Sequence, residues 1–217
     1  MGLLSEFFSE MLSRAMTRKA DAVVMSAQSR RVQRFAAEGG LHHTPPGRPV
    51  GHAAPALGEL CALGVPAAPE QACDVVGGTL RGIPVLGFDN PHVKLHALDG
   101  GHFWFAAARL PYACPDVIAR SPWEVRHAKG TPVTGWFPNL PHYVPLPGAS
   151  SGERGVLTAD PGFAAHAVGA VRGRGRSYRM SWAVRGHWAV TWDPGPVTLE
   201  RLRQRFGLVC DLAARCR

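Results

Sequence analysis

The apolar and polar residues at the start of the chain alternate with the period of an α-helix. Over residues 3–16 the apolar side chains fall on one stripe with polar ones opposite, and the pattern continues more weakly to Gly39-Gly40. We therefore expect an amphipathic helical arm over residues 1–40 that docks on a partner protein or on a membrane surface. The docking residues expected on it are Leu4, Phe8, Met11, Leu12, Arg14, Arg18 and Lys19.

Residues 41–72 show no such period and are rich in proline, alanine and glycine. This composition predicts a linker with one short helical turn near residues 56–62. The folded domain is then expected to span residues 73–217.

The period changes to two from residue 73 onward, which indicates β-strands. Residues 73–90 alternate about a two-residue turn at Arg81-Gly82 and predict a hairpin. Pro84 has no N–H to donate, so the second strand is expected to lie at an edge or to be distorted there. The predicted cross-strand pairs are Leu80 with Ile83, Gly78 with Val85, and Val76 with Gly87.

Further strands are predicted at residues 102–110, 116–120 and 155–158, with a long proline-rich loop over residues 121–151. Asp160 and Pro161 then open a short helix as its N-cap and first helical residue.

Residues 177–193 hold three of the six tryptophans of the chain and alternate apolar with polar positions on both sides of residues 185–187. We expect a hairpin whose turn or bulge places the three indole rings on one buried face. An apolar stripe at helical spacing over residues 199–216 predicts a closing helix that covers this face. The rings are those of Trp182, Trp188 and Trp192, and the arginines expected off the helical stripe are Arg201, Arg203, Arg205 and Arg215.

Strands followed by a closing helix predict an α+β fold, with a curved antiparallel sheet of about five to seven strands capped by the C-terminal helix. A pleckstrin-homology-like half-barrel is one architecture with this order of elements. The formal net charge of +8 favours acidic partners, namely nucleic acid, anionic lipid or an acidic protein.

The five cysteines include no C-x-x-C pair, and no basic, apolar leader precedes them. Neither a disulfide framework nor a zinc ribbon is therefore expected, and a reducing cytoplasm is the expected location, with peripheral attachment to a membrane as the alternative. No apolar run approaches the roughly 18 residues that a membrane-spanning helix needs.

Candidate chemistry is sparse. His92 and His96 would share a helical face, where Asp89, Asp99 or His102 would complete a metal site. Glycine and proline bound the segment, however, so a hairpin loop is expected as much as a helix. Cys114 is a weak candidate nucleophile. No serine elbow, phosphate-binding loop or dinucleotide fingerprint is present in the sequence, so we expect no enzyme activity and no cofactor.

A run of alternating arginine and glycine precedes the tryptophan-rich stretch. Arg172, Arg174 and Arg176 are candidate contacts to phosphate or another anion, and similar segments follow nucleic-acid backbones. Glycine in such a run also turns the chain between a helix and a strand.

Two short motifs, R-G-x-P-V at residues 81–85 and D-P-x-F-A at residues 160–164, precede the final tryptophan-rich stretch and the closing helix. Over residues 73–217 this layout resembles a loose set of uncharacterised proteins of high-GC Gram-positive bacteria. The resemblance implies a non-enzymatic role and brings no catalytic residues with it. Many members carry a membrane-spanning segment upstream, where this chain has the amphipathic arm.

These observations favour a non-enzymatic adaptor or accessory subunit that docks through its N-terminal helix on a protein partner or on a second copy of itself. The alternatives are a peripheral membrane protein that binds anionic lipid, nucleic-acid binding through residues 172–179, and a metal-dependent enzyme that uses His92 and His96.

Overall fold

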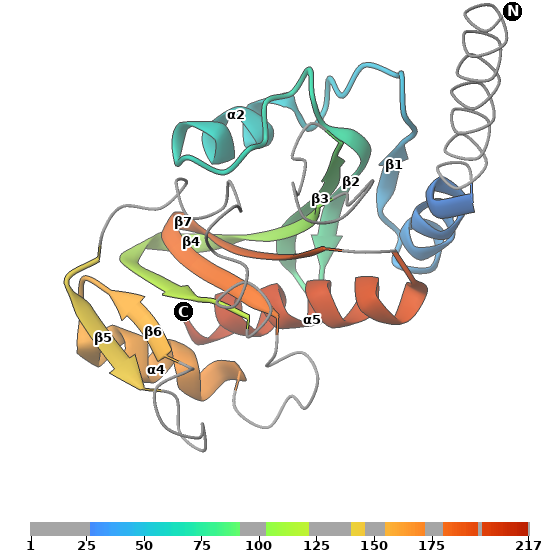
Figure 1. The fold of residues 1–217 in the computed structure, drawn as a ribbon. Helices are drawn as coiled ribbons and strands as arrows, with labels where there is room; N and C mark the ends of the chain where they lie inside the picture. Colours follow the sequence, from blue (N-terminus) through green and yellow to red (C-terminus); the bar gives the residue numbers. More distant parts are fainter. Residues whose placement is uncertain are drawn as a thin grey trace, which may run out of the picture.

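The structure is a computed structural model that describes residues 27–91, 103–121, 140–145, 155–171, 180–194 and 197–216. These residues form a curved, open antiparallel sheet of seven strands in the order β1-β2-β3-β4-β6-β5, with β7 also paired to β4 (Figure 1). A long C-terminal helix packs on one face, which confirms the predicted α+β class. The strands are β1 (His42–Thr44), β2 (Cys73–Leu80), β3 (Ile83–Asn90), β4 (Phe103–Ala119), β5 (His142–Pro145), β6 (Gly155–Thr158) and β7 (Ser181–Pro194).

The β2–β3 hairpin has the predicted register. Leu80 pairs with Ile83, Gly78 with Val85, and Val76 with Gly87. Arg81 and Gly82 both have positive φ, at 54° and 73°, as a two-residue type I′ turn requires.

The edge position predicted at Pro84 is confirmed, although the rest of β3 lies between β2 and β4. Its pairing with β4 begins at Val85, opposite Ala108, so Pro84 lies one residue outside it. The missing N–H of Pro84 therefore interrupts no bond to β4.

The two strands predicted at residues 102–110 and 116–120 are one long strand. β4 runs through Pro111 and Pro115 without a break in its assignment, and its register against β7 shifts on either side of Cys114. Bulges of this kind accommodate proline in a strand that the sequence pattern divides in two.

The segment predicted as a linker contains secondary structure and buried side chains. It supplies β1, which pairs with β2, and α2 (Ala54–Ala62), whose Leu57 and Leu60 are fully buried. The predicted helical turn is thus a helix of nine residues. Its apolar side chains cover the sheet face opposite the C-terminal helix (Figure 1).

Two helices follow β6, and both begin at residues that cap them. In α4 (Pro161–Val171) the predicted N-cap is confirmed, since Asp160 accepts a hydrogen bond from the Phe163 N–H at 3.0 Å. α5 (Leu199–Arg215) begins after Thr198, which accepts from the Arg201 N–H at 3.1 Å. The strand β5 lies within the segment predicted as an irregular loop.

All three tryptophans are buried, as predicted, but they lie on opposite faces of the sheet. Trp182 belongs to the core beneath α5, whereas Trp188 and Trp192 belong to the core beneath α2. No hairpin divides them, because β7 is one strand from Ser181 to Pro194. Gly186 has a φ of 52° opposite the bulge in β4, and this irregularity reverses the alternation of side chains between Val184 and Trp188.

Candidate functional site

A helix over residues 27–38 lies against one end of the sheet, beside β1 and the first turn of α5 (Figure 1). Its apolar side rests on α5, where the rings of Phe35 and Phe206 stack with centroids 4.8 Å apart. Val32 and Ala36 are buried in the same core. The polar residues of its first turn meet a group of buried charged side chains, and we call this contact the polar junction.

The polar junction joins the helix to β1, β2 and β3. Gln28 donates from Nε2 to Oδ2 of Asp89 at 3.1 Å, and the Ser29 hydroxyl donates to Oδ1 of Asp74. Nε2 of His43 lies 3.0 Å from the same Asp74 oxygen. Both carboxyl groups are fully buried, so these contacts offset part of the cost of taking them out of water.

Asp74 occupies an unusual backbone position. Its φ is 48°, and the β2–β3 register shifts between Cys73 and Val76. A non-glycine residue with positive φ is uncommon, and aspartate is one of the residue types that adopts it most readily. The bulge places the Asp74 carboxyl where His43 and Ser29 both reach it.

Arg205 adds a buried cation from α5. Its Nη2 donates to the main-chain oxygen of Asp193 at 3.1 Å and lies 3.8 Å from Oδ2 of the same residue. The guanidinium carbon lies 5.9 Å from the centroid of the Trp104 ring. Burial lowers the pKa of Arg205 to about 10, which leaves it charged at neutral pH.

Burial shifts the nearby carboxyl groups in the opposite sense. It raises the pKa of Asp89 to about 7, with a further contribution from the charge of Asp74 and an opposing one from Arg205. The pKa of Asp193 is also raised by burial, against the effect of Arg205 and Arg201. Asp89 therefore changes its charge near neutral pH.

The junction has the character of a structural contact rather than a catalytic one. Ser29 donates to Asp74 and not to His43, so serine and histidine do not form the nucleophile–base pair that acyl transfer requires. Among the described residues there is also no group of three or more histidine, cysteine or acidic side chains that would hold a metal ion.

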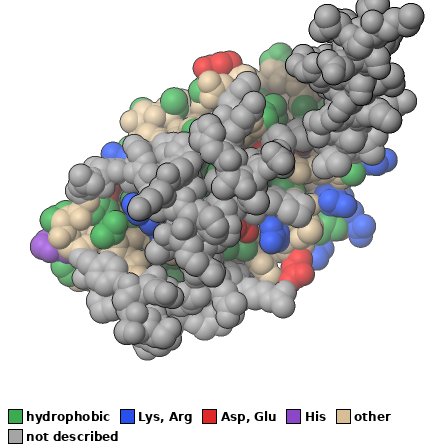
Figure 2. Space-filling model, in the orientation of Figure 1, with side chains coloured by type: hydrophobic (Ala, Val, Ile, Leu, Met, Phe, Trp, Pro, Cys, Tyr) green, Lys and Arg blue, Asp and Glu red, His purple; other side chains and the backbone are tan. Residues whose placement is uncertain are grey.

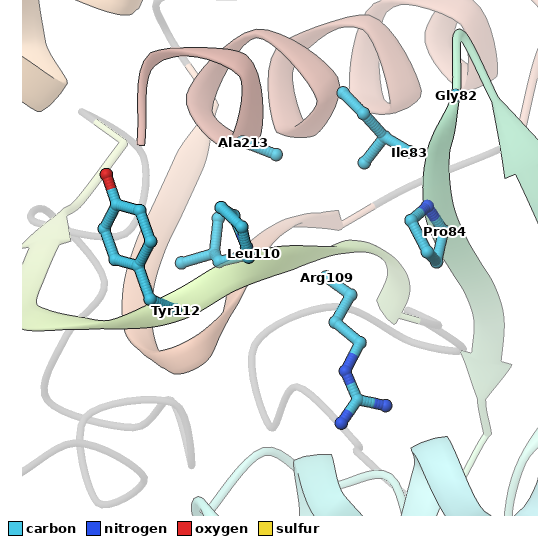
Figure 3. Close-up of a pocket in the computed structure, with 8 residues that line it drawn as sticks. Gly82, Ile83, Pro84, Arg109, Leu110, Tyr112 and Ala213 are labelled. Atoms are coloured by element: carbon cyan, nitrogen blue, oxygen red, sulfur yellow. The ribbon is translucent and has the colours of Figure 1, made fainter. Parts of the chain in front are cut away.

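Two surface hollows are formed by described residues. One, of about 450 Å³, is lined by apolar side chains of β3, β4 and α5 beside Arg109 and the half-exposed Tyr112 (Figure 3). The other, of about 540 Å³, is lined by Ala27, Arg30, Arg31, Arg34, Thr198 and Leu199. Neither lining includes a histidine, cysteine or carboxylate, the usual general acids and bases.

The site residues expected from the sequence lie outside the part of the chain that the structure describes. They are Leu4, Phe8, Met11, Leu12, Arg14, Arg18 and Lys19 of the arm, His92, His96 and His102, and Arg172, Arg174 and Arg176. Their roles stay predictions. Cys114 is described and buried, and burial raises its thiol pKa, which argues against a nucleophilic thiolate.

Sequence reasoning missed the polar junction, although one signal was present. Arg205 was expected off the apolar stripe of α5, but it is fully buried. It follows Leu202 by three residues and precedes Val209 by four, which is the spacing of the stripe itself. A charged residue at such a position indicates a buried acidic partner.

Within the described residues, no helix combines the length and apolar character needed to cross a membrane. No protein-family model matches the chain, and neither does any curated protein.

A solved structure does match over most of both chains. It is the crystal structure of the mycobacterial trehalose monomycolate transport factor A, TtfA, with a TM-score of 0.55 and 15% sequence identity. The match covers 88% of this chain and 94% of that chain. The two proteins thus share a fold.

Proposed function

We propose that this protein is a non-enzymatic accessory subunit of a membrane-transport assembly and docks on a protein partner through its N-terminal helical arm. The observation that carries the proposal is the shared fold with TtfA, a protein described as a transport factor, over nearly the whole length of both chains.

The way in which residues 27–38 are held supports the docking role of the arm. Phe35 stacks on α5, Gln28 bonds to Asp89 of β3, and Arg203 of α5 bonds to Glu38 at 2.7 Å. A displacement of residues 27–38 would therefore move the sheet and α5 with it. An arm joined by a flexible linker would not transmit such a displacement.

Site-specific photo-crosslinking in the native host tests this function. A photoreactive residue at Phe8 is expected to capture a component of a transport assembly, whereas the same residue at the exposed Arg48 is expected to capture none. Equal capture from both positions, or capture only of enzymes unrelated to transport, would refute the proposed docking.

A further inference from the structure

Three arginines of the helix over residues 27–38 line a hollow beside the start of α5, and two more lie on the first turns of α5 itself. We call them the arginine surface: Arg30, Arg31, Arg34, Arg201 and Arg203. Figure 2 shows basic side chains gathered at the right-hand edge of the molecule, where these two helices lie in Figure 1. The hollow of about 540 Å³ described above runs between the first three arginines and Leu199.

The periodicity of the helix explains why these arginines face outward. Gln28, Val32 and Phe35 recur at helical spacing and are buried, so Arg30, Arg31 and Arg34 fall on the remaining face. Arg34 has 70% of its side chain exposed, and Arg203 has 61%.

Three acidic side chains of the same region, Glu38, Asp193 and Glu200, stand against the five arginines. Glu200, in the first turn of α5, accepts a hydrogen bond from the Gln204 amide at 3.0 Å. Glu38 is shared between Arg34, at 3.0 Å, and Arg203, at 2.7 Å. Asp193 lies 3.7 Å from Arg201 but also pairs with the buried Arg205.

Two cations of the surface are left without a carboxylate among the described residues. Arg31 donates to the main-chain oxygen of Val197 at 3.3 Å, and Arg30 has no hydrogen-bond or ion-pair partner within those residues. A positive excess therefore remains along the hollow.

The geometry points to the phosphoryl headgroups of anionic phospholipids as the ligand of the arginine surface. A guanidinium presents a planar fork of donors that matches phosphate oxygens. A binding site for one free phosphate needs enclosed donors, whereas these side chains are well exposed and spread over two helices. Each would bind weakly, and a membrane with many phosphates makes several weak contacts at once.

The sequence upstream of the arginine surface is also basic, as a surface that faces an anionic membrane would be. Arg14, Arg18 and Lys19 belong to the same predicted amphipathic arm, so the basic character extends beyond the described residues. The inference goes beyond the proposed transport role and does not depend on it, because headgroup binding is a property of the purified chain alone.

Co-sedimentation of the full chain with vesicles tests the inference. Binding is expected to vesicles of equimolar phosphatidylglycerol and phosphatidylcholine and to weaken with added salt, with little binding to phosphatidylcholine alone. Each arginine removed is expected to weaken binding about fivefold, so the Arg30→Gln, Arg31→Gln, Arg34→Gln variant loses on the order of a hundredfold.

Two further variants separate a loss of headgroup contacts from unfolding and from a general loss of positive charge. Arg30→Gln with Arg34→Gln keeps the bond from Arg31 to Val197 and is expected to lose about 25-fold with an unchanged melting temperature. Arg48→Gln removes one exposed charge from the turn between β1 and α2 and is expected to bind as the unaltered chain does.

Three results would overturn the inference. The first is vesicle binding by the triple variant that equals that of the unaltered chain. The second is a loss of vesicle binding on Arg48→Gln as large as that of the triple variant. The third is saturable binding of inorganic phosphate that the triple variant abolishes while its vesicle binding stays unchanged. Each is read on purified protein, so it is separate from a failure of the crosslinking experiment.

Discussion

The guanidinium of Arg205 donates to the main-chain oxygen of Asp193 at 3.1 Å from a fully buried position beside Trp104. This contact ties the middle of α5 to the end of β7. Arg201 of the same helix pairs with the Asp193 carboxylate at 3.7 Å, so two side chains of α5 hold this residue.

Arg205→Ala is expected to lower the free energy of unfolding by about 3–5 kcal/mol, because it removes a fully buried guanidinium that bonds to Asp193 and whose charge stabilises the buried Asp89 carboxylate. The matched control is Arg203→Ala on the same helix, whose ion pair with Glu38 is exposed. That variant is expected to lose about 1 kcal/mol or less. Urea unfolding of both proteins measures the difference, and equal losses would show that Arg205 is not a buried anchor.

Asp89 is expected to make stability fall as pH rises. Its pKa is raised from 3.8 to about 7 in the folded state, so the unfolded chain releases the proton at lower pH than the folded one. The free energy of unfolding therefore decreases between about pH 4 and about pH 7, and above this window the loss is complete.

Asp89→Asn replaces the titrating carboxyl group with a neutral amide and keeps an oxygen that accepts from the Gln28 amide. Its stability is expected to match that of the unaltered chain at about pH 4 or below and to exceed it increasingly toward about pH 8. Urea unfolding at both pH values measures this. A pH-independent difference between the two proteins would contradict the raised pKa.

Gly87→Ala is expected to destabilise the fold by about 1–3 kcal/mol or more through overpacking. A Cβ at this position would lie 2.3 Å from Cη2 of Trp104 and 2.7 Å from Cζ of Phe206, between β4 and α5. Gly58→Ala in α2 is the control, since nothing lies within 4 Å of its Cβ. Because alanine favours a helix, that variant is expected to gain about 0.5–1 kcal/mol. The melting temperatures of both variants, compared with that of the unaltered chain, test these two expectations.

A chain that begins at residue 71 is expected to lose its cooperative thermal transition. A folded domain limited to residues 73–217, as the sequence pattern predicts, would not need the arm or the linker in order to fold. The truncation instead removes β1, α2 and the side chains of Val32, Phe35, Leu57 and Leu60 from the two cores. A sharp melt of the truncated protein, with the secondary structure of the full chain, would restore the earlier prediction.

The sequence by itself determined the elements whose signals are local. The turn at Arg81-Gly82 set the hairpin register, and Asp160 marked the start of α4. The stripe through Leu202, Phe206 and Val209 predicted α5 and its buried face. In each case, neighbours within a few residues decide the backbone conformation, so periodicity and capping rules suffice.

Only the tertiary structure decided how the chain assembles around those elements. The reversal of side chains at Gly186 depends on a bulge in β4, a strand about 70 residues earlier in the sequence, and it sends Trp182 and Trp188 to opposite cores. The polar junction joins residues that are 31 to 61 positions apart, so no local pattern marks it. The free-energy cost of burying these charged groups is offset only by partners from other elements. Those partners come together only when the chain folds.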